Sequence, residues 1–389
     1  MNKITLYFVC LLMPVNMLAQ EGLNIIPRPQ QAVLNDQSFQ MNQGLTILYD
    51  NELHDLAAYL SATLSPPTGW DFETKEADNP EQNTVFLSIN NNLDADDEGY
   101  RLSVTSESVQ ITGKSAAGVF YGIQSFLQLL PVEIYNKQRQ KDISWTIQGV
   151  EIIDAPSYPW RGVMLDVGRY FFSKDYVLQL IDKMSMYKMN VLHLHLIDDS
   201  GWRLEIKKYP KLTEIGAWRG EGHERTGGYY TQEDIKEIVG YAALRNVEVV
   251  PEIEIPAHTL SAIAAYPYLS CTEQQQKVQV QHSISRELYC VGKESTFEFL
   301  EDVFEEATEL FPSQYVHIGG DEARYDRWEA CPHCQERKKD LGLESEKELQ
   351  VYFTKRVQEM LKEHGKTIVG WDEIIEGGLE EKVVGMVWH

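Results

Sequence analysis

Apolar and polar residues follow two different patterns along the chain, and the pattern changes near residue 157. Before that point, residues 100–104 and 108–112 alternate apolar and polar positions, which is typical of strands buried on one face. Residues 116–130 carry apolar side chains at helical spacing. The pattern predicts a small α+β domain over residues 20–150, and this stretch holds no cluster of acids, histidines or cysteines of catalytic type.

After residue 157, short apolar strands alternate with helical segments. Alternating β and α segments with apolar strands predict a parallel sheet covered by helices. Ser345, followed by Glu348, has the form of a capping box at the start of one helix. The predicted strands are residues 162–165, 190–196, 247–255, 315–318, 367–369 and 383–387. The predicted helices are residues 176–187, 232–244, 296–310 and 345–363.

Polar residues at the strand ends favour a barrel over an open sheet. Acidic, basic or aromatic residues of functional type follow the C-terminal end of every predicted strand. A barrel gathers these ends around one opening, whereas an open sheet concentrates functional residues at one crevice. We therefore predict a (β/α)8 TIM-type barrel over residues 151–389. Because only six strands are present, we expect it to lack its last two β/α units, so that the chain is truncated at its C-terminus.

Composition narrows the range of partners and the compartment. The formal charge of −24 and the pI near 4.8 argue against binding to nucleic acid or to an anionic membrane. Residues 1–19 resemble a signal peptide, with Lys3 before the apolar residues 4–12 and Ala19 at the expected cleavage site. We expect an exported protein, periplasmic or secreted, without a membrane anchor. The oligomeric state does not follow from the sequence.

Four cysteines remain once the predicted signal peptide is removed. An even number in an exported chain predicts disulfides, for which three connectivities are possible. We favour pairing of sequence neighbours, Cys271 with Cys290 and Cys331 with Cys334. The segment 331–334 also has the spacing of half a zinc site, but no second Cys-x-x-Cys or His pair accompanies it, so we expect no metal.

Two adjacent acids, Asp321 and Glu322, follow the strand at residues 315–318. Gly319 and Gly320 separate them from the strand and allow the backbone to turn sharply. Neighbouring carboxylates make each other harder to ionise, which is unfavourable unless the pair has a use. A site that needs one protonated acid beside one ionised acid has this arrangement, so the pair predicts acid–base chemistry.

The other strand ends carry further candidates. Taken alone, each has an ordinary structural explanation as an ion pair, a helix cap, a hydrogen-bonded histidine or a core aromatic. Their occurrence at every strand end is what indicates a site. They are Arg161 and Asp166 at the first strand, Asp198 and Asp199 at the second, Glu252, Glu254 and His258 at the third, Trp371 and Glu373 at the fifth, and Trp388 at the sixth.

These motifs together resemble glycoside hydrolase family 20, the β-N-acetylhexosaminidases. The most specific is the His-Ile-Gly-Gly-Asp-Glu segment at residues 317–322, supported by residues 194–203 and 251–258. The resemblance extends into the first domain through residues 98–100 and 117–124. It implies an exo-acting enzyme that removes terminal β-linked GlcNAc or GalNAc from oligosaccharides or glycoconjugates by a substrate-assisted retaining mechanism, without a cofactor or metal.

The resemblance also implies roles for the acids and their neighbours. Glu322 would protonate the glycosidic oxygen and later activate water, while Asp321 stays ionised and orients the 2-acetamido group. His258 and Asp166 would form a relay that positions the general acid. Arg161 would bind sugar hydroxyls.

Four further residues have supporting roles by the same resemblance. Asp198 and Glu254 would lie behind the catalytic residues, and Glu254 stands where many relatives carry Asp. Trp371 and Trp388 would wall the pocket around the acetamido methyl group. Relatives take further sugar-binding residues from later barrel strands, so we expect the 389-residue chain alone to be poorly active or unstable.

Three other readings remain open from the residues alone. His193 and His195 share one strand face and could serve a metal-dependent hydrolase, although we favour their packing within the barrel. A glycan-binding fragment without turnover would keep the pocket. An ordinary two-carboxylate glycosidase would pair Glu322 with another acid such as Glu373 and would also cleave sugars that lack the acetamido group.

Overall fold

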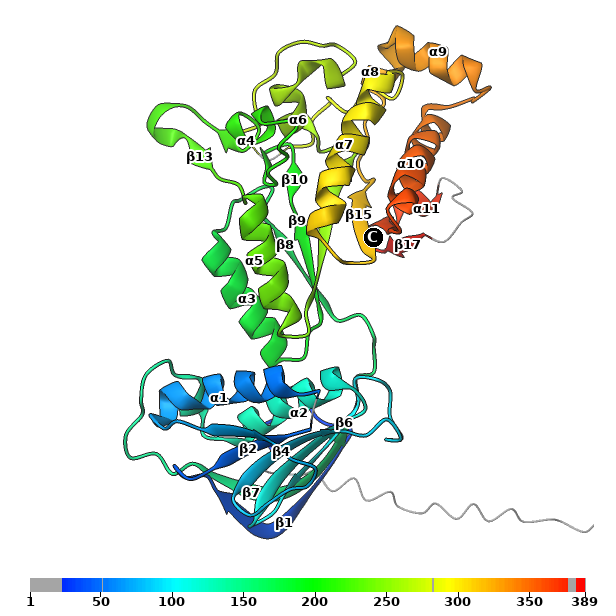
Figure 1. Cartoon of the computed structure of the whole chain (residues 1–389). Coiled ribbons are helices and arrows are strands. Elements are labelled where there is room, and N and C mark those ends of the chain that lie inside the picture. Colours follow the sequence, from blue (N-terminus) through cyan, green and yellow to red (C-terminus); the bar gives the residue numbers. More distant parts are fainter. Residues whose placement is uncertain (1–22, 51, 282, 377–382, 389) are drawn as a thin grey trace, which may run out of the picture.

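The chain folds into two units, each built on one main sheet (Figure 1). The computed structural model describes residues 23–50, 52–281, 283–376 and 383–388. The predicted signal peptide, residues 1–19, lies outside the described residues.

The first unit is a seven-stranded mixed sheet with the strand order β1-β7-β5-β6-β4-β2-β3. Two helices cover the face of this sheet that is directed toward the second unit (Figure 1). The strands and helix predicted over residues 100–104, 108–112 and 116–130 are confirmed to within one residue. The elements are β1 Gln31–Gln40, β2 Thr46–Tyr49, α1 His54–Thr68, β3 Glu73–Glu76, β4 Thr84–Ile89, β5 Tyr100–Val104, β6 Ser108–Gly113, α2 Ala116–Leu129, the 3-10 helix Val132–Tyr135 and β7 Thr146–Asp154.

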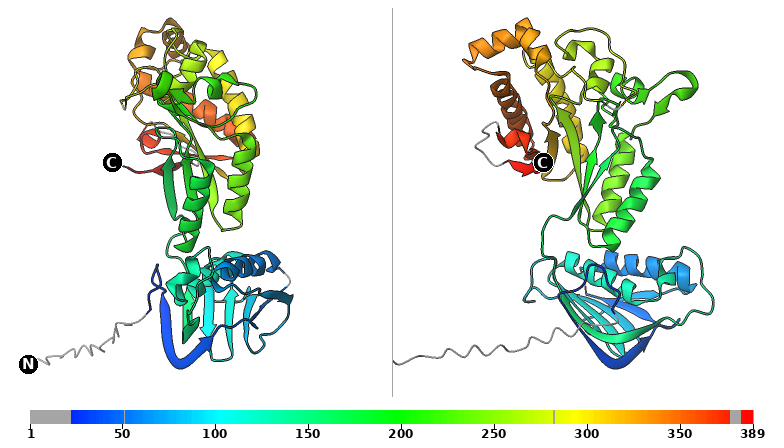
Figure 2. Two further views of the ribbon diagram at one scale, coloured as in Figure 1. Left: turned by 90° about the vertical axis from the view of Figure 1, so that its left-hand side faces the viewer. Right: turned by 180° about the vertical axis from the view of Figure 1, so that it is seen from behind.

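The second unit contains a six-stranded parallel sheet that curls as half of a barrel (Figure 2). Its order, β17-β16-β15-β14-β9-β8, follows the chain from one edge to the other without a reversal. Such an order is that of a barrel, because a doubly wound open sheet reverses direction at a switch point. The predicted fold class and all six predicted strands are confirmed. The strands are β8 Gly162–Asp166, β9 Val191–His195, β14 Glu248–Ile255, β15 Tyr315–Gly319, β16 Thr367–Trp371 and β17 Val384–Met386.

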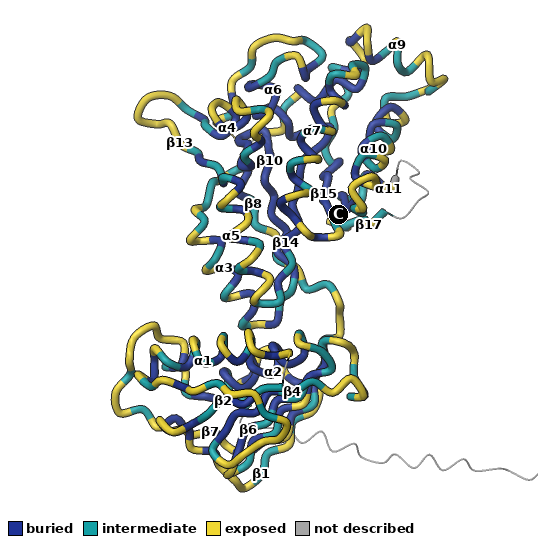
Figure 3. The backbone as a smooth tube through the Cα atoms, viewed as in Figure 1, coloured by how far each residue is buried: buried dark blue, intermediate teal, exposed yellow. Residues whose placement is uncertain are grey.

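Four long helices cover the outside of the curled sheet, and α3, α5, α7 and α10 each contact the next in that order. Their apolar sides are buried against the strands, and their polar sides face solvent (Figure 3). The Ser345 side chain caps α10 by accepting a hydrogen bond from the Glu348 N–H, while the Glu348 carboxylate accepts one from the Glu344 N–H. The helices are α3 Lys174–Met186, α5 Gln232–Ala243, α7 Glu294–Leu310 and α10 Glu346–Glu363.

Shorter elements fill the loops after the strands, mostly at the carboxyl edge of the sheet (Figure 1). Within the described part of the chain, no helix has the length and apolar character needed to cross a membrane. The short elements are β10 Ile197–Asp198, β11 Gly201–Trp202, α4 Lys211–Glu214, β12 Trp218–Arg219, the 3-10 helix Gly222–Glu224, β13 Thr226–Gly227, α6 Leu260–Ala265, the 3-10 helix Pro267–Leu269, α8 Asp326–Ala330, α9 Pro332–Asp340 and α11 Glu373–Glu376.

Candidate active site

The strand register brings side chains from different strands to one level of the sheet. Asp166 pairs with His195 across β8 and β9, His195 with Glu252 across β9 and β14, and Glu252 with His317 across β14 and β15. All these strands are parallel, so the segments that follow them emerge at the same edge. The acid pair after β15 therefore lies beside the segments that follow β8, β9 and β14.

The turn that carries Asp321 and Glu322 depends on two glycines with left-handed backbone, Gly319 at φ 63° and Gly320 at φ 100°. A Cβ atom on Gly319 would lie 1.2 Å from Glu254 Oε2, so no larger residue fits there. Glu322 also adopts a positive φ, 53°, which is uncommon for a residue with a side chain and is concentrated at functional sites.

His258 lies between four carboxylates, and its own φ is 52°. Its Nε2 is 3.2 Å from Glu322 Oε2 and 3.5 Å from Asp321 Oδ2. On the other side of the ring, Nδ1 is 3.3 Å from Asp198 Oδ2 and 3.7 Å from Asp199 Oδ2. The imidazole therefore connects the acid pair after β15 with the acid pair after β9.

In the predicted relay, the histidine is His258, but its acidic partner is Asp198 and not Asp166. Asp198 holds Nδ1 of His258, whereas Asp166 accepts hydrogen bonds from the backbone N–H and the guanidinium of Arg169, at 2.8 and 2.7 Å. Asp166 is the last residue of β8, and its carboxylate binds Arg169 in the loop that follows the strand.

The predicted role of Arg161 in sugar binding is also wrong. Arg161 precedes β8, so it lies at the amino edge of the sheet, opposite the acid pair. Its guanidinium binds both carboxylate oxygens of Glu98, at 2.8 and 3.0 Å, and the Tyr121 hydroxyl at 2.9 Å. Glu98 and Tyr121 belong to the first unit, so Arg161 joins the two units.

Arg169 contributes a cation to the site, and it was not among the residues predicted from the sequence. Its second guanidinium nitrogen lies 3.1 Å from Asp198 Oδ2, and more than a third of its side chain is exposed to solvent. Burial alone would lower the pKa of Arg169, but Asp198 and Asp166 raise it above its usual value. The signal was available, because Arg169 follows the predicted strand end and Arg161 precedes the strand.

The electrostatics separate the acids into protonated and ionised groups. Burial raises the pKa of Asp321, but hydrogen bonds from His258 and Glu254 lower it below its usual range. Burial, together with the nearby charge of Asp321, raises the pKa of Glu254 well above its usual range. Burial and the neighbouring Asp198 likewise raise the pKa of Asp199, to about 6.

His258 carries a positive charge among these acids. Burial alone would lower the pKa of His258, but its contacts with Asp198 and Asp321 raise it to about 11. A protonated imidazole between these carboxylates therefore favours the ionised form of Asp321 near neutral pH.

Trp371 and Trp388, the two tryptophans predicted to form an aromatic wall, lie close to each other at the ends of β16 and β17. The Trp371 ring centre lies 4.8 Å from that of His317 and 6.4 Å from that of Trp388. Trp388 is half exposed, and its indole N–H donates to Glu373 at 3.1 Å. A cavity of about 290 Å³ is lined by Glu322, Tyr325, Gln350 and Glu373, among others.

The histidines considered for a metal-dependent hydrolase surround a buried carboxylate. Glu252 Oε2 is 2.7 Å from His193 Nε2 and 2.5 Å from His195 Nδ1, and Glu252 Oε1 is 3.0 Å from His317 Nδ1. Burial raises the pKa of Glu252, but the imidazoles of His195 and His317 lower it well below its usual range. These contacts describe a polar network that fills the barrel interior beneath the site.

The predicted disulfide pairing is not present. Cys271, Cys290, Cys331 and Cys334 are all free thiols. Sulfur–sulfur distances of 3.6 to 3.8 Å relate Cys334 to Cys271 and Cys290, and Cys290 to Cys331, which is longer than a disulfide bond of about 2.05 Å. The four side chains nevertheless gather in one place, which sequence neighbours alone did not predict.

A half-barrel sheet with a pair of carboxylic acids at its carboxyl edge is an arrangement that suits the class of glycoside hydrolases. The sequence model of Glycosyl hydrolase family 20, catalytic domain, matches residues 158–389, and that of Glycosyl hydrolase family 20, domain 2, matches residues 22–155. The chain belongs to glycosyl hydrolase family 20.

Individual relatives agree with this assignment. A beta-hexosaminidase of Porphyromonas gingivalis is 43% identical over 95% of this chain and 48% of its own length, and one of Vibrio furnissii is 34% identical over 91% and 58%. The structure of the GH20 β-N-acetylhexosaminidase of Streptomyces coelicolor superimposes with a TM-score of 0.82, at 36% identity over 94% of this chain and 69% of that one. The chain spans about half the length of the curated relatives it matches.

Proposed function

We propose that the protein carrying this chain removes terminal β-linked N-acetylglucosamine or N-acetylgalactosamine from glycans, with retention of configuration and with the substrate's own acetamido group as the nucleophile. The observation that carries the proposal is the His258 imidazole, which contacts both Asp321 and Glu322 at the carboxyl edge of the sheet. Two acids adjacent in sequence are poorly placed to attack a sugar from opposite faces, as two-carboxylate glycosidases do.

Glu322 is the proposed general acid and base. Its side chain is 31% exposed, so it can reach a bound glycosidic oxygen, and His258 orients its carboxyl group. Glu322 donates a proton to the leaving oxygen while the acetamido oxygen attacks the anomeric carbon. In the second step Glu322 accepts a proton from the water molecule that opens the resulting ring.

Asp321 is the proposed partner of the acetamido group. Its side chain is only 13% exposed, and the contacts with His258 and Glu254 keep it ionised. An ionised carboxylate accepts the acetamido N–H and stabilises the positive charge that develops on the ring formed in the first step. Trp371 provides an apolar wall for the methyl group and excludes competing water.

Arg169 and Asp166 are the proposed ligands of the sugar hydroxyls. They lie at the carboxyl end of β8 and are held together by two hydrogen bonds. Asp198 connects Arg169 with His258, so the binding and the acid–base parts of the site share one carboxylate. We also infer from residues 1–19 that the protein is exported; amino-terminal sequencing of protein recovered from the periplasm or medium tests this.

Relatives support the substrate class. The structure of an exo β-N-acetylglucosaminidase of Vibrio harveyi was determined in complex with N-acetylglucosamine, and it superimposes with a TM-score of 0.81 at 32% identity.

The test compares aryl glycosides with the 389-residue chain and, where its reading frame continues, with the longer product. We expect cleavage of the aryl N-acetyl-β-glucosaminide and retention of the β-anomer in the first product seen by NMR. The matched aryl β-glucoside, which lacks the acetamido group, is expected to remain intact. Equal cleavage of both glycosides indicates a two-carboxylate mechanism, and binding without cleavage indicates a glycan-binding protein.

A further inference from the structure

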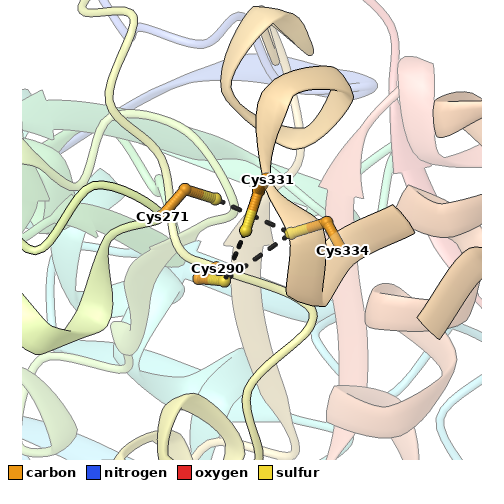
Figure 4. A group of neighbouring side chains, drawn as sticks. All are labelled: Cys271, Cys290, Cys331 and Cys334. Carbon is orange, nitrogen blue, oxygen red and sulfur yellow. Dashed lines mark hydrogen bonds between the residues drawn. The ribbon is translucent and has the colours of Figure 1, made fainter. Parts of the chain in front are cut away.

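The four cysteines converge from two separate loops of the second unit (Figure 4). Cys271 and Cys290 belong to the segment between β14 and α7, and Cys331 and Cys334 lie at the start of α9, after the turn that carries the acid pair. Cys290, Cys331 and Cys334 are buried, and Cys271 is half-buried. All four sulfur atoms lie within 4.8 Å of one another.

The distances within the cluster are those of a tetrahedral metal site. Cys271 and Cys334 are 3.6 Å apart, Cys290 and Cys334 3.6 Å, and Cys290 and Cys331 3.8 Å, measured between Sγ atoms. Four sulfur ligands at about 2.3 Å from a tetrahedral zinc ion lie about 3.8 Å from one another. A pair of disulfides would instead bring the sulfurs of each pair to about 2.05 Å.

The backbone around the cluster is shaped for close approach of the two loops. A Cβ atom on Gly292 would lie 2.3 Å from the carbonyl carbon of His333 and 2.5 Å from the backbone nitrogen of Cys334, so a larger residue at 292 would separate the loops. The buried Trp328 donates its indole N–H to the carbonyl of Tyr289 at 2.8 Å, which ties the same two loops at a second point.

Cys334 lies in the first turn of α9, where the helix dipole favours the negative charge of a thiolate.

We propose that Cys271, Cys290, Cys331 and Cys334 form a structural Zn²⁺ site that joins the loop after β14 to the loop after β15. Four thiolates in a closed tetrahedron select zinc and leave no open position for a substrate, so the ion has a structural role. The site fixes the segment that follows Asp321 and Glu322, and it does not depend on the reaction proposed above.

Metal analysis of the purified wild-type protein tests the proposal without any variant. We expect one equivalent of zinc per chain and, after denaturation with a chelator and without reductant, four thiols that react with a thiol reagent. Replacement of zinc by Co²⁺ is expected to give the absorption of tetrahedral cobalt–thiolate coordination. Absence of zinc overturns the proposal, whether the cysteines are then recovered as disulfides or as free thiols, and so does iron in place of zinc.

Variants locate the ligands. Cys290→Ser and Cys334→Ser are expected to lose zinc during dialysis against a chelator that leaves the wild-type protein loaded. His333→Ala is the matched control, because His333 lies between two ligands but is exposed; it is expected to keep its zinc. Loss of zinc in His333→Ala alone, with retention in the cysteine variants, would refute the ligand assignment.

Discussion

Replacing Arg161 by alanine is expected to destabilise the protein without removing a sugar-binding group. The guanidinium donates five hydrogen bonds, two to Glu98 and one each to Tyr121, Tyr158 and Lys188. The side chains of Arg161 and Glu98 are 14% and 21% exposed, so truncation leaves a largely buried carboxylate without its cation. Loss of one partner of a fully buried ion pair costs about 3–5 kcal/mol, and we take about 3 kcal/mol here because some solvent reaches the pair.

Urea unfolding followed by tryptophan fluorescence and by circular dichroism measures this loss. The two probes report whether the units still unfold together, which matters because Arg161 links them. The double variant with Glu98→Gln completes a thermodynamic cycle, in which we expect a coupling free energy of about 1–3 kcal/mol. Arg101→Ala, at an exposed position of β5, is the control and is expected to change stability by less than about 0.5 kcal/mol.

Two results would refute the reasoning. A stability loss below about 1 kcal/mol in Arg161→Ala would show that the joint between the units does not depend on this ion pair. Unchanged stability with weakened glycan binding would restore Arg161 to the sugar-binding role that the sequence suggested.

Three further predictions concern the site itself. Arg169→Ala is expected to lower kcat/KM for N-acetyl-β-glucosaminides about 10- to 100-fold, because a charged hydrogen bond to a sugar is lost; an unchanged kcat/KM would exclude Arg169 as a sugar ligand. The pKa of His258 is raised to about 11, so protonation of its imidazole stabilises the folded state fully below the unfolded pKa near 6.5, and this stability is lost as pH rises toward 11. The unfolding free energy of the wild type should therefore fall by about 1.4 kcal/mol per pH unit above pH 7 relative to His258→Asn. Parallel pH profiles of the two proteins would contradict this. Gly319→Ala is expected to lower the unfolding free energy by at least about 2 kcal/mol and to abolish activity. Gly365 has a similar φ, but no atom lies within 4 Å of the position of its Cβ, so Gly365→Ala should cost only about 1 kcal/mol. Equal losses in the two variants would contradict the steric argument.

The fold could be predicted because buried and exposed positions leave a clear pattern of apolar and polar residues in the sequence. The six strands of the second unit are short apolar runs followed by polar residues, so both their positions and their direction could be read from the sequence. Strand direction then places the polar ends at one edge, which is why Asp321, Glu322, His258 and Asp198 meet as expected.

The errors arose where the sequence offers more than one side chain for the same role. Asp166 and Asp198 both follow strands, and only the three-dimensional turn shows that Asp198 faces His258 while Asp166 faces Arg169. Arg161 and Arg169 lie on opposite sides of β8, and the resemblance alone did not distinguish the arginine before the strand from the arginine after it. The cysteine cluster joins segments 41 to 63 residues apart, a proximity that local spacing does not contain.

The separate roles proposed for Asp321 and Glu322 are tested most directly by the hydrolysis rates of a series of aryl N-acetyl-β-glucosaminides whose leaving groups differ in pKa. Glu322→Gln is expected to slow poor leaving groups by about 10²–10⁴ and activated ones far less, because only poor leaving groups need a proton. Asp321→Asn is expected to slow every member of the series by a similar factor, because the acetamido group participates whatever the leaving group. The same loss for both variants on every leaving group would contradict the account.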